Sequence, residues 1–213
     1  MQNKDLQKST FYLKYGKRIF DIFISLTGLI ILSPFLVVIV LSIKFFDKGP
    51  IFYKQDRVGQ NFEHFQLIKF VTMKVAGFSS GPLITRSNDE RITKIGKILR
   101  KFKLDEIPQI FNVLKGEMSV VGPRPEVGKF VNLFKEDYKE ILKVKPGMAS
   151  ETVIVFRDEE RILAQFKDLE QGYIEEVLPK KISIDRDYVR NISFLKDCRI
   201  FILTFLRVIY FRK

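Results

Sequence analysis

Cysteine and histidine are almost absent, since the 213-residue sequence has one of each, Cys198 and His64. A lone cysteine excludes an internal disulfide framework. A lone histidine argues against a histidine-based metal site and against a Ser-His-Asp triad. Any metal bound by this chain is therefore expected to be a hard ion held through oxygen ligands.

Acidic residues are few compared with basic ones. The chain has 25 Asp and Glu against 37 Lys and Arg, which gives a formal net charge of +12 and a pI near 9.7. This excess implies an anionic partner, which could be nucleic acid, a phosphorylated small molecule or the anionic face of a membrane. The hydrophobic share of 46% is ample for a buried core, and no repeat or low-complexity segment is visible.

Charge is missing altogether between residues 22 and 43, "IFISLTGLIILSPFLVVIVLSI". As a straight helix this run would reach roughly 33 Å, enough to cross a bilayer. Ser33-Pro34 in its middle predicts a break, because proline removes a backbone hydrogen bond. Both flanks are basic, which favours the cytoplasmic side for both ends. The basic residues on the flanks are Lys8, Lys14, Lys17 and Arg18 before the run and Lys44, Lys48, Lys54 and Arg57 after it. We therefore favour a helix-break-helix hairpin that enters one leaflet and returns, over a straight span or a buried helix.

The rest of the chain has a globular pattern of the α+β class. Short strands are expected at 51–55 and 65–73, joined by a turn in which Asn61 can adopt a left-handed conformation. Small and turn residues at 75–88 predict a mobile loop. Helices are expected from residue 89, with one apolar face among lysines and arginines, and over 193–212. The second fits an interfacial helix, whereas the first could lie on a membrane or be a solvated basic face over the core.

An aspartate and a glutamate stand side by side in "KLDEIPQ", residues 103–109. In a helix, Asp105 and Glu106 would point in different directions. One interpretation is the start of the helix "PQIFNVLK", where proline and acidic residues are favoured. The other is a catalytic pair of carboxylates, and the spacing alone leaves both open.

The segment "GEMSVVGPRP", residues 116–125, joins a short apolar strand to a stiff loop. Gly122 permits close backbone approach, while Pro123 and Pro125 restrict the chain around Arg124. A rigidly held guanidinium suits a phosphate oxyanion, but it can equally serve as a structural ion-pair partner.

Six segments, in order, resemble the bacterial sugar transferases, and in particular the small monotopic polyprenyl-phosphate phosphoglycosyl transferases. They are "KRIFDIFISLTGLIILSP", "GPIFYKQDRVG", "KFVTM", "ERITKIGKILRKFKLDEIPQIFNVLKGEMSVVGPRP", "VKPG" and "DYVRNISFLKDCRIFILTFLRV". The resemblance covers nearly the whole chain, and the stretch from LDEIPQ to GPRP is its most specific part.

This resemblance implies a reaction and a set of site residues. Such enzymes transfer sugar-1-phosphate from a nucleotide-diphosphate sugar, usually a UDP-sugar, to undecaprenyl phosphate, which yields undecaprenyl-diphosphate-sugar and UMP. The reaction starts the assembly of capsule, exopolysaccharide, O-antigen or protein glycans. Asp105 would be the nucleophile that carries a covalent phospho-sugar and a ligand of Mg²⁺, and Glu106 would assist by positioning or proton handling. The substrate-binding residues implied are Lys69, Arg100, Pro123 and Arg124.

The resemblance also implies an organisation. Residues 1–48 would form a re-entrant anchor broken at Ser33-Pro34, and residues 49–213 a catalytic domain with a small sheet and amphipathic interfacial helices, on the cytoplasmic face of the bacterial inner membrane. Val71 stands where many members have Arg or Lys, and "KPGMASETVIVFRDEERIL" departs from many relatives, so the sugar is not predicted. In that segment Arg157, Asp158 and Glu159 are expected in a surface turn or in contact with substrate.

The resemblance leaves the oligomeric state open between monomer and homodimer. The alternative function is a non-catalytic basic membrane-surface adaptor. Nucleic acid is not an expected partner, because no nucleic-acid-reading motif accompanies the positive charge.

Overall fold

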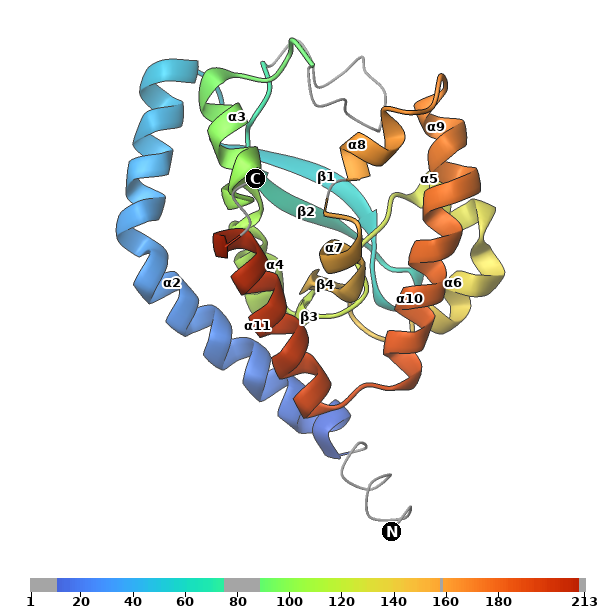
Figure 1. Cartoon of the computed structure of the whole chain (residues 1–213). Coiled ribbons are helices and arrows are strands. Elements are labelled where there is room, and N and C mark those ends of the chain that lie inside the picture. The colour runs from blue at the N-terminus through green and yellow to red at the C-terminus, as the bar shows by residue number, and fades with distance from the viewer. Residues whose placement is uncertain (1–10, 75–88, 158, 211–213) are drawn as a thin grey trace.

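A computed structural model of the chain describes residues 11–74, 89–157 and 159–210 (Figure 1). The loop predicted at 75–88 lies outside these residues, as does Asp158. The strands are β1 (Phe52–Val58), β2 (His64–Phe70), β3 (Ser119–Val121) and β4 (Gly147–Ala149). The helices are α2 (Lys17–Ser42), α3 (Lys94–Lys101), α4 (Gln109–Lys115), α5 (Gly128–Leu133), α6 (Lys135–Ile141), α7 (Glu151–Val155), α8 (Glu159–Leu163), α9 (Leu169–Gly172), α10 (Leu178–Arg190) and α11 (Phe194–Tyr210). The described residues combine many helices with two small sheets, which confirms the predicted α+β class.

The predicted strand pair is present as an antiparallel hairpin of β1 and β2, in which Phe52 faces Phe70 and Val58 faces His64. Its turn contains Asn61 at φ 54°, the left-handed conformation expected there. A second sheet pairs β3 with β4 in parallel, a pairing that the sequence did not indicate. At this pairing the backbones are so close that a Cβ on Gly147 would lie 2.0 Å from the Gly122 nitrogen. Glycine is therefore required at 147, and Gly122 permits the close approach that was predicted.

One long helix forms the N-terminal part of the molecule. The stretch Tyr12–Asp47 is long and apolar enough to cross a membrane, and α2 makes up its centre, with a π-helical turn at either end. Figure 1 shows that the helix changes direction near its middle without ending. The bend expected at Ser33-Pro34 is present, whereas the break of the predicted helix-break-helix anchor is wrong, because the helix continues through the proline. Proline cannot donate to the carbonyl of Ile30, but the Ser33 hydroxyl donates to that oxygen instead, at 2.8 Å, so the helix continues.

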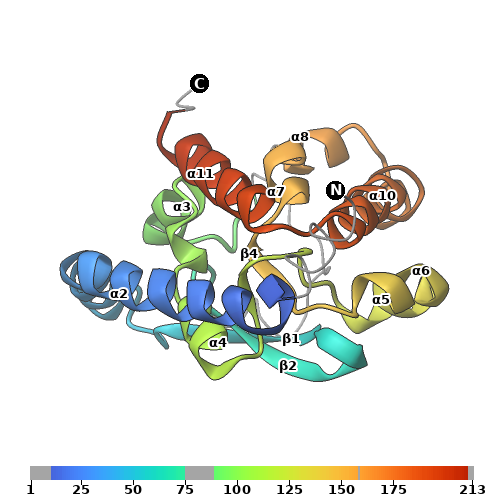
Figure 2. The same ribbon diagram turned by 90° about the horizontal axis from the view of Figure 1, so that it is seen from below.

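The molecule has two unlike sides. In both views α2, α3 and α11 lie on the left, while α5, α6 and α10 lie on the right (Figures 1 and 2). The left-hand helices expose large apolar side chains, for example Phe35, Phe46, Ile98 and Phe205, which are 53% to 75% exposed. On the right, α10 is joined to α6 by ion pairs of Arg186 with Asp137 and Glu140 and of Arg190 with Glu140. Apolar exposure is therefore concentrated on one side.

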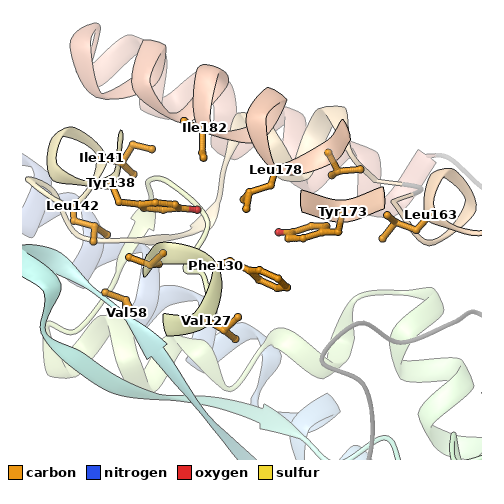
Figure 3. Packing of buried hydrophobic residues seen from close by; sticks show 12 residues of the cluster. Val58, Val127, Phe130, Tyr138, Ile141, Leu142, Leu163, Tyr173, Leu178 and Ile182 are labelled. Carbon is orange, nitrogen blue, oxygen red and sulfur yellow. The ribbon is translucent and has the colours of Figure 1, made fainter. Parts of the chain in front are cut away.

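The largest buried cluster lies between the β hairpin and α10 (Figure 3). It contains Phe130, Tyr138 and Tyr173, and Figure 3 shows the hydroxyl ends of the two tyrosines turned toward each other. A second cluster gathers side chains from α2, α4, β3 and α11, with Val113, Met118 and Val121 at its centre. The start of the predicted anchor is therefore built into the same core as the globular part.

Polar side chains fix the first turns of α2 to that core. Arg18 donates to the carbonyls of Val113 and Leu114, in the last turn of α4, at 2.6 and 2.8 Å. Asp21 accepts from Ser119 Oγ and Val120 N, both at 2.8 Å. Lys17 and Arg18 were interpreted as a basic membrane flank, but both act as structural donors.

The predicted helix after residue 89 is shorter than expected. It begins at Lys94, because the Thr93 side chain accepts from the Gly96 backbone nitrogen and acts as an N-cap. The predicted single apolar face is divided, since Leu99 is 2% exposed and packs on β2 and α2, whereas Ile98 is 53% exposed. At the other end of the chain, α11 agrees with the expected helix.

Candidate active site

The two adjacent acids lie in a single 3₁₀ turn, Leu104–Glu106, between α3 and α4. Lys103 precedes the turn in the left-handed conformation, at φ 54°, and reverses the chain after α3. A lysine in this conformation is uncommon and is typical of functional regions. Successive residues of a 3₁₀ turn are about 120° apart, so the two acidic side chains diverge as predicted.

Asp105 is buried and poorly satisfied. It is 9% exposed, and its Oδ1 atom has no hydrogen-bond partner among the residues that the structure describes. Burial raises the pKa of Asp105, the negative charge of Glu106 raises it further, and the charges of Lys69, Lys103 and Arg100 act in the opposite direction. The carboxylate is therefore a high-energy group that gains from any cation or electrophile placed beside it.

Glu106, in contrast, is fully engaged. Its Oε1 atom accepts from Arg124 Nη2 at 2.6 Å and from Lys69 Nζ at 3.3 Å, and Oε2 lies 3.3 Å from Arg124 Nη1. Burial alone would raise the pKa of Glu106, but Arg124 and Lys69 outweigh it and hold the pKa well below the ordinary value. Glu106 is thus an acidic group whose ionised form is favoured and that gathers two cations beside Asp105.

Lys69 is the second-last residue of strand β2, at the end of the hairpin opposite its turn. Burial lowers its pKa, while the neighbouring Glu106 opposes that change. Arg124 makes two hydrogen bonds to Glu106, and the charge of Glu106 raises the already high pKa of Arg124. The structure therefore brings together Asp105, Glu106, Lys69 and Arg124, which were predicted to share a site.

Backbone hydrogen bonds hold the residues on both sides of Arg124 in its loop. Gly122 N donates to Ala149 O at 3.0 Å, and Pro123 O accepts from Gly147 N at 2.8 Å. Pro125 O accepts from Arg57 Nη1 at 3.2 Å. These hydrogen bonds, two of them made at the β3–β4 pairing, add to the restriction that the two prolines impose on the loop. Pro123 itself is buried, so its place in the site is as a support of the loop.

A buried polar network behind this loop was missed at the sequence level. Arg57 pairs with Glu126 at 3.0 Å, and Tyr173 donates to the other oxygen of the same carboxylate. Lys181 donates to the Tyr173 hydroxyl at 3.3 Å and pairs with Glu159. Glu126 directly follows the GPRP motif, which was the only local signal for it. The network fixes the loop of Arg124 from below and links it to α8.

Three further predicted residues lie outside this group of four. Arg100 donates from Nε to Thr72 Oγ1 at 2.9 Å, and its charge acts on Asp105 from α3. Glu159 was predicted in a surface turn or at the substrate, but it pairs with the buried Lys181 instead. Arg157 lies between α7 and α8.

The donor set can be tested against the predicted magnesium ion. Over the described ranges, no group of three acidic, histidine or cysteine side chains could hold a metal through protein ligands alone. Mg²⁺, however, is usually bound through one or two carboxylates together with substrate phosphates. The unpartnered Oδ1 of Asp105 is an oxygen ligand of this kind. The residues fit a magnesium ion shared with a phosphorylated substrate.

Comparisons with known proteins identify the family of this chain. The family described as bacterial sugar transferase matches residues 12–211. Exopolysaccharide production protein PSS of Rhizobium leguminosarum bv. phaseoli is 38% identical over 193 residues, which cover 86% of this chain and 90% of that protein. Exopolysaccharide production protein ExoY of Sinorhizobium fredii is 34% identical over 197 residues, with 85% and 80% covered.

A longer relative carries an enzyme name. The UDP-glucose:undecaprenyl-phosphate glucose-1-phosphate transferase of Klebsiella pneumoniae is 36% identical over 197 residues. The match covers 88% of this chain but 39% of that protein. The chain therefore spans most of the two exopolysaccharide proteins and less than half of this transferase.

Proposed function

Because this chain belongs to the bacterial sugar transferase family, we propose that it is a phosphoglycosyl transferase that moves sugar-1-phosphate from a UDP-sugar to undecaprenyl phosphate. The observation that carries the proposal is the contrast within one turn between an unpartnered buried carboxylate, Asp105, and a carboxylate that gathers two cations, Glu106. The products are undecaprenyl-diphosphate-sugar and UMP, at the start of exopolysaccharide or related glycan assembly.

The transfer proceeds in two displacements at one phosphorus atom. In the first, an oxygen of the Asp105 carboxylate attacks the sugar-linked phosphorus, and the bond from that phosphorus to the oxygen of the UMP phosphate breaks. UMP leaves with the electron pair. In the second, an oxygen of undecaprenyl phosphate attacks the same phosphorus and the acyl phosphate bond breaks, which restores the carboxylate. A carboxylate suits both steps, because an acyl phosphate remains reactive enough to be discharged.

Cations are required because both displacements bring anions together. Lys69 and Arg124 lie on Glu106 and are positioned to stabilise the transferring phosphoryl oxygens electrostatically. Glu106 is a poor proton carrier, since its pKa is held well below the ordinary value, so its role is to position these cations. Asp105 would hold Mg²⁺ through a carboxylate oxygen, and the ion would neutralise charge on the diphosphate.

A re-entrant position of α2 in the cytoplasmic leaflet is part of the proposal. The first turns of α2 pack on α4 and β3, and at its other end Ile39 and Ile43 pack on Phe70 and Leu99. Both ends of the long helix therefore contact one globular body, which favours a helix that stays on one side over a straight span. The apolar exposure of α2, α3 and α11 on the same side supports contact of all three with lipid.

The decisive experiment follows UMP release from a panel of UDP-sugars by the full chain in detergent with Mg²⁺, first without and then with undecaprenyl phosphate. We expect a burst of UMP without acceptor, no larger than the enzyme concentration, and continuous release once acceptor is added. Asp105→Asn is expected to abolish both phases. Glu106→Gln is expected to retain a slower burst, because it weakens the hold on Lys69 and Arg124 but leaves the nucleophile.

Mass spectrometry of the enzyme after the burst is expected to detect a phospho-sugar on Asp105 that hydroxylamine removes. Asp56→Asn serves as the control, because Asp56 is an exposed acid on the hairpin that pairs with exposed His64. Normal turnover by folded Asp105→Asn would refute the mechanism. No adduct and no release from any donor, also in cell extract, would favour the membrane adaptor.

A further inference from the structure

Asn112, in the middle of α4, is fully buried, and its side-chain amide makes three hydrogen bonds. Its Oδ1 atom accepts from the Ile68 backbone nitrogen at 3.1 Å, and its Nδ2 atom donates to the Gln66 carbonyl oxygen at 2.8 Å. Nδ2 also donates to Glu117 Oε2 at 2.6 Å. A buried amide is costly unless it is paired, so these bonds hold Asn112 and its three partners in one arrangement.

The two bonds to β2 imitate those of a neighbouring strand. Among the described residues, β2 has one strand neighbour, β1, in a two-stranded sheet. A residue of a parallel strand bonds to the carbonyl of one residue and to the amide of the residue two positions further on. The Asn112 amide makes this pair of bonds with Gln66 and Ile68. It therefore fixes α4 against β2 in a single register, because a slip of β2 by one residue would break both bonds.

The three segments that Asn112 joins are the segments that carry the charged residues around Asp105. The bonds to β2 lie directly before Lys69 in the chain. The helix of Asn112 begins three residues after Glu106, and Glu117 starts the segment that runs through β3 to the loop of Arg124. Asn112 bonds to the backbone of β2 and to Glu117 rather than to the charged groups themselves. It is therefore placed to set their spacing from behind the site.

We propose that Asn112 is a positioning residue that sets the spacing of Lys69, Glu106 and Arg124, an inference that rests on the proposed function. Glu106 contacts Lys69 at 3.3 Å and Arg124 at 2.6 Å, and both contacts cross between segments that the Asn112 amide joins. Electrostatic stabilisation of a transferring phosphoryl group depends on charges that are in place before the reaction. A misplacement of about 1 Å can cost about a hundredfold in rate. Loss of the amide should therefore slow the first displacement.

Three variants remove the bonds of the amide in different ways. Asn112→Leu has nearly the same size and removes all three. Asn112→Asp keeps the acceptor for the β2 nitrogen, loses both donations and places a negative charge against Glu117. Asn112→Asp combined with Glu117→Gln exchanges donor and acceptor between these two side chains. This swapped pair retains two of the three bonds, so it provides a rescue and a folded protein if Asn112→Leu does not fold.

The kinetic measurement is the rate of the acceptor-independent UMP burst at saturating UDP-sugar. Asn112→Leu and Asn112→Asp are expected to lower this rate by about tenfold to a hundredfold, and the swapped pair should recover most of the loss. Ile182→Ala is the control, because Ile182 is buried beside α10 and its truncation lowers stability without touching these bonds. At a temperature at which it is folded, it should keep the native rate. Native burst rates in both single Asn112 variants would overturn this inference and leave the proposed function intact.

A second measurement needs no turnover, so it separates this inference from the proposed function. Lys69→Met and Glu106→Gln, singly and together, give the coupling of the two side chains as a difference of urea midpoints in micelles. We expect Asn112→Asp to reduce this coupling to about half or less, and the swapped pair to restore it. Ile182→Ala should leave it unchanged. Equal coupling in every background would show that Asn112 serves the fold alone, which overturns the proposal even if no UDP-sugar is turned over.

Discussion

The buried ion pair of Lys17 and Asp197 offers the sharpest test of how the long helix is held. The Asp197 side chain is fully buried and accepts from Lys17 Nζ at 2.5 Å, Tyr12 OH at 2.6 Å and Tyr188 OH at 2.7 Å. Lys17 Nζ also donates to Val121 O at 2.8 Å. The cluster therefore ties the start of α2 to β3, α10 and the start of α11.

Removing one charge leaves the other buried without compensation. Asp197→Asn is expected to lower the free energy of unfolding by about 3–5 kcal/mol, the usual cost of breaking a buried pair. Lys17→Met should cost less, near the lower end of that range of about 3–5 kcal/mol, because two tyrosine hydroxyls still donate to Asp197. In the double variant no charge remains unpaired, so its cost should fall short of the sum by about 1–3 kcal/mol.

The assay is guanidinium unfolding of the full chain in micelles, followed by circular dichroism at helical wavelengths. The only thiol, Cys198, directly follows Asp197 and provides a local probe, since its labelling rate rises when the start of α11 opens. Glu176→Gln is the control, because its pair with Lys180 is exposed and should be worth at most about 0.5 kcal/mol. Additive costs of the two single variants, within about 0.5 kcal/mol, would refute the reasoning.

Three further changes test other parts of the molecule. Asp105→Asn should stabilise the protein at neutral pH without Mg²⁺ by on the order of 1 kcal/mol, because it removes a buried unpartnered charge, and a lower denaturation midpoint would contradict this. Ser33→Ala should destabilise α2 in nanodiscs by about 0.5–1.5 kcal/mol, because it leaves Ile30 O without a donor. Ser42→Ala is the control, since it removes a similar hydrogen bond from a carbonyl that keeps its helical donor. Equal shifts in thermal midpoint for the two variants would contradict the role given to Ser33. Burial raises the pKa of Asp185 well above its ordinary value. The contribution of protonated Asp185 to the free energy of unfolding is therefore lost as pH rises from its ordinary pKa through its folded-state pKa. The urea midpoint of Asp185→Asn, relative to that of the native protein, should therefore rise as the pH is raised from about 4 to about 8. A difference in midpoint that stays constant with pH would exclude the ionisation of Asp185 as its cause.

Local features of the fold could be predicted from the sequence because they depend on neighbouring residues. The hairpin follows from alternating strands on either side of a residue that tolerates φ 54°, Asn61. The divergence of Asp105 and Glu106 follows from helical geometry alone. Their association with Lys69 and Arg124 came from the resemblance to a family, since nothing in the spacing places a hairpin lysine beside an acid 37 residues away.

Long-range polar pairs escaped prediction for a physical reason. Lys17 looked like a basic membrane flank because its partner, Asp197, is 180 residues distant. Charge in a sequence identifies a candidate donor but not whether it faces solvent, lipid or a buried acid. The bend at Ser33-Pro34 shows the same limit, because proline predicts a lost donor and cannot tell whether a serine hydroxyl replaces it.

The adjacency of the two acids has a functional logic that follows from their partners. If Asp105 itself bound Arg124, its charge would be satisfied, and the attack on phosphorus proposed for it would be weaker. Glu106 takes up both cations and keeps them within one turn of Asp105, so the proposed nucleophile keeps an oxygen without a partner among the described residues while the positive charge stays close. The neighbouring acid thus separates two demands that a single carboxylate cannot meet, which are to attack an anion and to hold the cations that make this attack feasible.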